Sequence, residues 1–252
     1  MTPEERRLTE ALLYLPTLYS SVTWRPYGLL FCDAQNPASM DANHAVILNP
    51  SADLNAALDD IVRYYRVRCM PPLLYSGYQP EEAKWLLPHL RSAHWRLKYV
   101  TASFYRRTKN ILPQYNRGVC IEHPAFLTAE SAALLTEGGG EWTLGITERL
   151  LRSPNAKAYA ARAQDGRLAA WLMLLVFRGC GFVQDVFTLP AYRHQGLCTA
   201  LISRAAEEFA REWNYPLYLC AENPNAVRIY ERAGFTLYRV LSQPDWWAAP
   251  GE

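Results

Sequence analysis

The amino-acid sequence predicts an α/β protein with a mixed central sheet, flanking helices and two domains. At 252 residues the chain is longer than one average domain. From about residue 116 onward, strand-like and helix-like segments follow one another to the end of the chain. A polar segment with a proline, residues 106–114, separates this half from a less regular first half. We therefore expect two domains, residues 1–110 and 111–252.

The composition is that of a globular enzyme. Lys and Arg number 26 against 24 Asp and Glu, a net charge of +2 that does not indicate a nucleic-acid partner. The six cysteines form no C-x-x-C pair and no Cys/His cluster, so we expect no disulfide, no metal and a reducing, cytoplasmic location. The apolar runs at 11–19 and 171–177 are too short for a signal peptide or a membrane span, so no membrane association is expected.

The second half predicts the order βααβββαβαβ. Thr128 is a candidate N-cap, Asp165-Gly166 favours a tight turn between two strands, and Gly234 suits a left-handed helix end. The expected elements are a strand at 118–121, helices within 124–139 and 143–154, two strands within 156–178, a strand at 181–190, a helix from 197 to about 213, a strand at 216–222, a helix within 223–235 and a strand at 236–241. The long helix has an apolar stripe of Leu197, Leu201, Ala205, Phe209 and Trp213.

The first half partly repeats this pattern. Residues 54–77 predict a helix followed by a proline-led strand, as 197–222 do, and residues 80–104 predict a helix and a strand, as 224–241 do. This indicates an internal repeat at the level of pattern. The alternative is that any α/β chain repeats helix–strand units.

The most informative segment is residues 188–201, where a strand ends at Pro190 and a helix begins near Gly196. A glycine at such a junction exposes backbone N–H groups at the positive end of a helix, where phosphate oxygens bind. The alternative is a glycine required only for steric reasons.

These residues resemble the GNAT N-acetyltransferases. The family run V-x-P-x-x-R-x-x-G-x-G/A is matched by Thr188, Pro190, Arg193 and Gly196, and the family's N-x-x-A-x-x-x-Y-x-x-x-G-F is matched in full. The positions of the second motif are Asn223, Ala226, Tyr230, Gly234 and Phe235. The chain departs from the first motif twice, with Thr188 for the usual valine and Cys198 where the family has Gly or Ala, and the added bulk of Cys198 puts the affinity for the cofactor in question.

The resemblance implies a GNAT acyl-CoA N-acyltransferase fold with acetyl-CoA as co-substrate. The backbone N–H of Val186 or Phe187 would polarise the thioester carbonyl, and Asn223 would bond to pantetheine. The residues implied to touch the cofactor are Val186, Phe187, Thr188, Arg193, His194, Gln195, Gly196, Leu197, Cys198, Thr199, Asn223, Ala226 and Tyr230.

Acyl transfer from a thioester to an amine needs a neutral amine, a stabilised oxyanion and a proton for the departing thiolate. Tyr230 matches the family tyrosine that donates a proton or hydrogen bond to the thiolate; without the motif it would be read as a core aromatic. Asp185 is the first candidate for the base and Glu222 the second, although either could be an ordinary strand-end carboxylate. His194 lies within the expected phosphate loop, where a cation would suit phosphate better than a proton shuttle.

Under the same resemblance the first half is a second GNAT-like unit without a cofactor site, because no R-x-x-G-x-G/A follows Pro50. The expected function is therefore transfer of an acetyl group to a primary amine of a small molecule or a peptide, by a monomer or homodimer. The alternatives are a non-catalytic acyl-CoA sensor and a scaffold that uses only the fold.

Overall fold

The structure is a computed structural model that describes residues 1–79, 81–108 and 115–251, without the side chains of 99–102 and 241–246. The chain divides into two compact units. The first contains Met1–Thr101 and Leu241–Glu252, and the second contains Ala102–Val240. The sequence predicts one division, at 110/111, whereas the two units are bounded at 101/102 and again at 240/241. Most of the connection expected at 106–114 lies outside the described residues.

The strands of the second unit form a mixed sheet in the order β5-β10-β9-β8-β7-β6, and the first residues of β11 Phe235–Ala248 lie on the other side of β5. The strands of this sheet are β6 Ile121–Glu122, β7 Ala156–Arg162, β8 Leu168–Phe177, β9 Cys180–Thr188, β10 Leu217–Cys220 and the end of β5 Arg96–Arg107. β9 and β10 are parallel, and the other described pairs in this sheet are antiparallel. The expected Asp165-Gly166 turn joins β7 to β8, with Gly166 at φ +86°.

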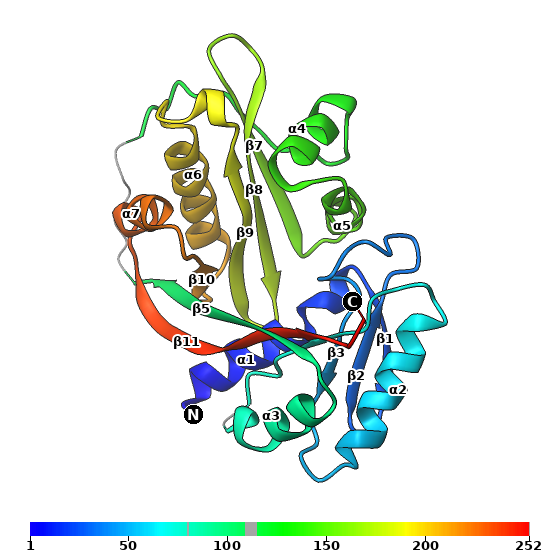
Figure 1. Cartoon of the computed structure of the whole chain (residues 1–252). Helices are drawn as coiled ribbons and strands as arrows, with labels where there is room; N and C mark the ends of the chain where they lie inside the picture. Colours follow the sequence, from blue (N-terminus) through cyan, green and yellow to red (C-terminus); the bar gives the residue numbers. More distant parts are fainter. Residues whose placement is uncertain (80, 109–114, 252) are drawn as a thin grey trace. The chain divides into compact units, whose positions relative to one another are not determined.

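Helices cover both faces of this sheet (Figure 1). One face carries α4 Ala129–Gly139 and α5 Trp142–Leu151, and the other carries α6 Leu197–Glu212 and α7 Pro224–Arg232. Thr128 caps α4 as expected, because its hydroxyl accepts a hydrogen bond from the Ser131 amide at 3.1 Å. Gly234 follows α7 at φ +88°, so the βααβββαβαβ order is confirmed for these elements.

The core of the second unit lies between the sheet and α6. Leu197, Leu201, Ala205 and Phe209 are buried in it, as the apolar stripe predicted. Trp213 was wrongly assigned to that stripe: it is the C-cap of α6 in extended conformation and is 39% exposed. The chain leaves the helix there because Pro216 follows three residues later.

The first unit has a sheet of five strands in the order β1-β2-β3-β4-β11. The strands are β1 Ser21–Arg25, β2 Gly28–Cys32, β3 Ala45–Ile47, β4 Leu73–Tyr75 and the end of β11 Phe235–Ala248. β3 and β4 are parallel, and the others are antiparallel. The helical elements are α1 Pro3–Tyr14, η1 Leu15–Leu18, α2 Leu54–Arg66 and α3 Glu82–Ser92.

The strand pairing follows the repeat seen in the sequence. The run β1-β2-β3-α2-β4-α3-β5 has the same order as β7-β8-β9-α6-β10-α7-β11, with the parallel pair in the same place. The final strands are exchanged: β5 of the first run pairs with β10, and β11 of the second run pairs with β4. Each unit is therefore completed by a segment from the other half of the sequence. Within the described residues, no helix is long and apolar enough to cross a membrane.

Candidate functional site

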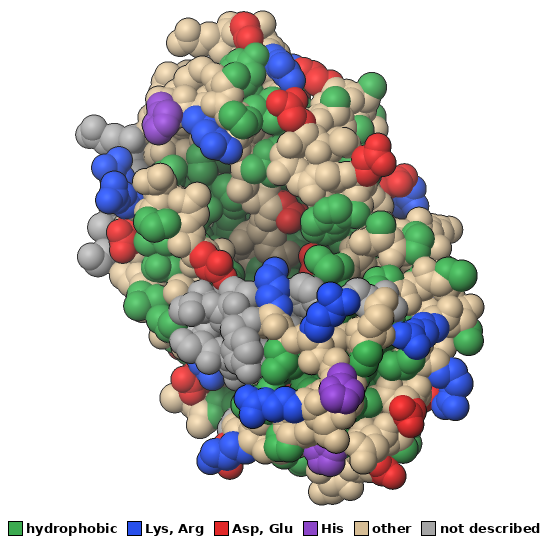
Figure 2. Space-filling view, in the orientation of Figure 1, with side chains coloured by type: hydrophobic (Ala, Val, Ile, Leu, Met, Phe, Trp, Pro, Cys, Tyr) green, Lys and Arg blue, Asp and Glu red, His purple; other side chains and the backbone are tan. Residues whose placement is uncertain are grey.

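The site lies where β9 and β10 of the second unit separate. The two strands pair at Gly181, Phe182 and Val183 of β9, and no described β9–β10 pair follows Val183–Leu219. β10 is held from its other side by β5, because Cys220 pairs with Phe104 and the Ala221 amide donates to the Ser103 carbonyl at 3.0 Å. Figure 2 shows this face hollowed over β8 and β9, with hydrophobic side chains on the wall toward α6 and acidic atoms on its floor.

β9 contains a bulge at the level of this opening. Its register against β8 shifts between Trp171, which pairs with Phe187, and Met173, which pairs with Gln184. Two residues of β9, Asp185 and Val186, therefore lie opposite one residue of β8, Leu172. Asp185 has φ +52°, a left-handed conformation that is uncommon for a residue with a side chain, and it is exposed. The bulge redirects the strand at the residues proposed for the thioester.

A turn of unusual geometry connects β9 to α6. We call residues 190–196 the phosphate turn; it starts with the 3-10 helix η2 Pro190–Tyr192. His194 and Gly196 have φ +64° and +79°. Gly196 is the N-cap of α6 and provides no side-chain hydrogen bond, so no side chain caps the first-turn amides of α6. A Cβ at Gly196 would meet nothing within 4 Å. This open, uncapped helix end is suited to bind an anion.

Tyr230 and Cys198 meet on the α6–α7 side of the opening. Tyr230 is 6% exposed, and its ring packs edge-on against Phe235 with the centroids 6.4 Å apart. Burial raises the pKa of the phenol, with a smaller contribution from the Cys198 thiol. Burial also raises the pKa of Cys198 to about 11. The Tyr230 hydroxyl makes no hydrogen bond to any described residue. It is not one of the fully buried polar atoms that lack a partner, so part of the oxygen is exposed. Because its pKa is raised, the hydroxyl is neutral and can donate a hydrogen bond.

Asn223 and Glu222 lie just after β10 and are both exposed. Asn223 caps α7: its side-chain oxygen accepts a hydrogen bond from the Asn225 amide at 2.9 Å. This contact fixes the side-chain amide and leaves its NH₂ group available to donate to a carbonyl. Pro224 at the first position of α7 adds to the rigidity of this corner.

Several residues that the sequence singled out are close in the fold. Leu197 and Tyr230 are buried in one apolar cluster, and Val186, Cys198 and Ala226 pack against it. Arg193, His194, Gln195 and Gly196 are exposed on the phosphate turn, and Thr199 is half-buried in the first turn of α6. Thr188 has a buried hydroxyl without a hydrogen-bond partner.

On the face toward α4, Phe187 makes packing contacts that the sequence did not indicate. Phe187 pairs with Trp171 across the sheet, so both side chains lie on this face. A Cβ on Gly138 of α4 would lie 2.3 Å from the Phe187 ring, which shows that the ring touches the helix backbone. Trp171 is fully buried, and its indole N–H has no partner. No local pattern marks these contacts, because they join segments that are distant in sequence.

The equivalent strand-to-helix junction of the first unit, at the start of α2, has a side-chain cap. Its helix α2 is capped by Asp53, whose carboxylate accepts a hydrogen bond from the Ala56 amide at 3.1 Å. A carboxylate at this helix end satisfies the amide and repels a second anion. The start of α6 differs in this respect, because its N-cap Gly196 makes no side-chain hydrogen bond.

Comparison with known proteins relates most of the second unit to one family of enzymes. The model of the acetyltransferase (GNAT) family matches residues 125–235. An acetyltransferase from Agrobacterium fabrum is 36% identical over 75 residues, which are 30% of this chain and 55% of that protein. The match thus spans about half the length of this relative.

Solved structures share the fold along most of the chain. A GCN5-related N-acetyltransferase from Kribbella flavida has a TM-score of 0.69 at 19% identity, covering 100% of this chain and 97% of the other. A tandem GNAT protein from the clavulanic acid biosynthesis pathway has a TM-score of 0.57 at 13% identity, covering 82% and 74%. At these identities the likeness concerns the fold alone.

Proposed function

Because residues 125–235 match the model of the acetyltransferase (GNAT) family, we propose that the protein transfers an acetyl group from acetyl-CoA to a primary amine. The observation that carries the proposal is the opening between β9 and β10 beside the uncapped end of α6. The opening would receive the pantetheine arm, and the phosphate turn would receive the pyrophosphate.

The cofactor contacts would come mainly from backbone groups. Amides of residues 194–198 would bind the pyrophosphate, and Arg193, which is exposed on this turn, would add positive charge nearby. The Asn223 NH₂ group would donate to a pantetheine carbonyl. An amide of Val186 or Phe187, at the bulge, would polarise the thioester carbonyl.

The reaction forms a C–N bond and breaks a C–S bond. The neutral amine attacks the thioester carbonyl, the oxyanion collapses, and coenzyme A leaves as the thiolate. Tyr230 donates a proton or hydrogen bond to that sulfur, a role supported by its neutral, surface-reaching hydroxyl. The amine loses its proton to Asp185 or, as the second candidate, Glu222; both carboxylates are exposed.

The bulk of two aromatic side chains supports a preference for acetyl over longer acyl groups. Phe187 and Trp171 fill the side of β9 that faces α4, next to the position proposed for the thioester. The acceptor is proposed to be a small molecule or peptide, since the net charge of +2 gives no reason to expect a polyelectrolyte. We further propose that the protein is cytoplasmic and acts as a monomer or homodimer. The first unit is proposed to lack a cofactor site.

Calorimetric titration of acetyl-CoA into the protein tests this function, with Gly196→Glu as the matched variant. The glutamate would place a carboxylate at the end of α6, where a Cβ meets no protein atom. We expect micromolar binding to the wild type and none to the variant. A screen of amines, with Tyr230→Phe as the control, then identifies the acceptor.

Failure to bind acetyl-CoA would refute the enzyme and leave a scaffold with this fold. Binding without turnover across a broad amine panel would instead favour an acyl-CoA sensor.

A further inference from the structure

The phosphate turn is anchored by hydrogen bonds over its first residues. The Leu189 amide donates to the Ala169 carbonyl and the Tyr192 amide to the Leu189 carbonyl, each at 2.9 Å. Arg193 Nε donates to the Thr188 carbonyl at 3.3 Å. The side chains of the next residues, His194 and Gln195, make no hydrogen bond within the described part of the chain.

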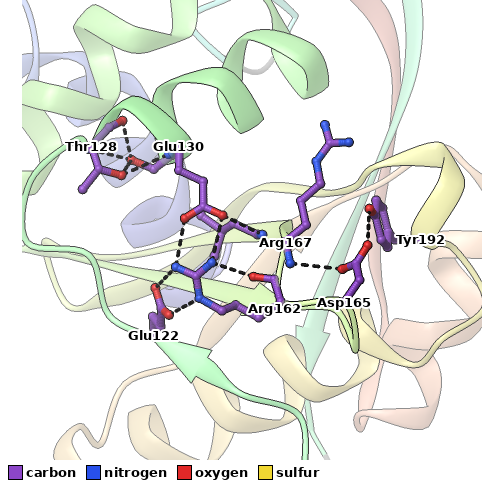
Figure 3. Close-up of polar contacts among 10 residues, drawn as sticks. Glu122, Thr128, Glu130, Arg162, Asp165, Arg167 and Tyr192 are labelled. Atoms are coloured by element: carbon purple, nitrogen blue, oxygen red, sulfur yellow. Dashed lines mark hydrogen bonds and ion pairs between the residues drawn. The ribbon is translucent and has the colours of Figure 1, made fainter.

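Two side-chain contacts tie this turn to the β7–β8 hairpin: the hydrogen bond made by the Tyr192 hydroxyl, and the Arg167 guanidinium, which lies 5.8 Å from the centre of the Tyr192 ring. The Tyr192 hydroxyl donates to Asp165 Oδ2 at 2.7 Å (Figure 3). The other oxygen of the same carboxylate, Oδ1, accepts the Arg167 amide at 3.0 Å and so shapes the hairpin turn. The hydrogen bond from Tyr192 is the main reason that the pKa of Asp165 is lowered.

The hairpin that carries Asp165 is itself fixed to α4. Glu130 of α4 accepts hydrogen bonds from Arg162 at 2.8 and 2.9 Å and from the Leu168 amide at 3.0 Å (Figure 3). Arg162 also donates to the Gly166 carbonyl at 2.8 Å, and Arg167 pairs with Glu137 of α4 at 2.9 Å. Asp165 is therefore a firm anchor, although it is exposed.

We propose that Asp165 is a positioning residue for coenzyme A: through Tyr192 it holds the phosphate turn in the shape that receives the pyrophosphate. This inference rests on the proposed function. The turn needs such support because His194 holds a left-handed conformation, which costs a residue with a side chain about 1 kcal/mol. A turn that is already ordered loses less entropy when the ligand binds.

The test compares two ligands that differ in the pyrophosphate. Tyr192→Phe removes the hydroxyl and keeps the ring. We expect the dissociation constant for coenzyme A to rise about threefold to tenfold, as for the loss of one hydrogen bond. Binding of S-acetyl-pantetheine, which has no pyrophosphate and is followed by ligand-observed NMR, should not change.

Further variants separate positioning from a general loss of structure. Asp165→Ala should weaken coenzyme A binding as Tyr192→Phe does, the double variant should be no weaker than either, and Asp165→Asn, which keeps an acceptor oxygen, should restore most of the affinity. The control is Tyr215→Phe, an exposed tyrosine that makes no hydrogen bond among the described residues. Melting temperatures should stay unchanged throughout.

Three results would overturn the inference: unchanged coenzyme A affinity in Tyr192→Phe, equal losses for both ligands, or additive losses in the double variant. If the wild type binds no coenzyme A, the proposed function fails and this inference fails with it. The wild-type titration therefore distinguishes the two failures.

Discussion

The ring of Phe187 lies against the backbone of Gly138, so that a Cβ on Gly138 would come within 2.3 Å of the ring. Only glycine lets α4 approach β9 this closely. The ring has no room to move toward the helix, and it pairs with the buried Trp171 across the sheet. The position of one aromatic ring beside the proposed thioester is thus set by the absence of one methyl group.

Removing that ring should change the acyl preference. Phe187→Ala opens space on the α4 side of β9, so we expect the kcat/KM ratio of butyryl-CoA to acetyl-CoA to rise about tenfold, equivalent to one or two buried methylenes. Steady-state kinetics with a series of acyl-CoA thioesters measures this. Phe126→Ala, at a ring that is 69% exposed, is the control. An unchanged ratio in both variants would exclude Phe187 as the residue that limits chain length.

The opposite change should perturb the same contact. Gly138→Ala forces the Phe187 ring or α4 to shift, which we expect to destabilise the protein by about 1–3 kcal/mol, as overpacking does. Urea denaturation measures the loss. The double variant Gly138→Ala/Phe187→Ala should regain part of it, because the clashing ring is gone; no recovery would mean that the clash is elsewhere.

Tyr230→Phe should slow the reaction and leave the fold intact. The ring keeps its contact with Phe235, and only the donor is lost, so we expect kcat to fall about 10²-fold at an unchanged melting temperature. Because burial raises the pKa of this phenol, it stays protonated above pH 10 in the folded protein, and the wild-type rate should show no loss from its ionisation below that pH. A variant with wild-type kcat would remove Tyr230 from the mechanism.

His44 of the first unit should make stability depend on pH. It is 4% exposed, and burial lowers its pKa from 6.5 to about 4. As the pH falls below 6.5, His44 therefore binds a proton in the unfolded chain but stays neutral in the folded protein. The contribution to stability is fully present above pH 6.5 and falls by roughly 3 kcal/mol between pH 6.5 and 4.

Urea denaturation at a series of pH values measures this dependence. His44→Gln should flatten it, whereas His194→Gln, at an exposed histidine, should leave it unchanged. Equal slopes for the wild type and His44→Gln would contradict the assignment.

Trp247 should be essential for the stability of the first unit. It is 2% exposed in a cluster with Leu74 and Ile61, although it lies at the end of β11. Trp247→Ala should lower the free energy of unfolding by about 3–5 kcal/mol. Trp213→Ala, at a tryptophan that is 39% exposed, should cost much less. Similar losses of unfolding free energy in the two variants would show that burial of Trp247 at the end of β11 has no special role in stability.

The local elements of the second half could be predicted because their signals are local. A Thr128 cap, an Asp165-Gly166 turn and Gly234 each act within a few residues, and each has the expected geometry. The strand exchange could not be predicted, since the backbone of β11 would satisfy either sheet edge equally well. The bulge at Asp185 could not be predicted either, because it depends on the register between β8 and β9. The Tyr192–Asp165 contact joins two segments that are distant in sequence, so neither segment alone predicts it.

The exchanged strands also affect how the protein is made on the ribosome. Leu73 of β4 pairs with Ala248, so the edge of the first sheet has no partner until residue 248 has been synthesised. During that time the emerging polypeptide presents an unpaired strand edge, which is a template for aggregation. We expect folding of the first hundred residues to finish only after Ala248 has emerged from the ribosome, with a slow phase set by this long-range pairing.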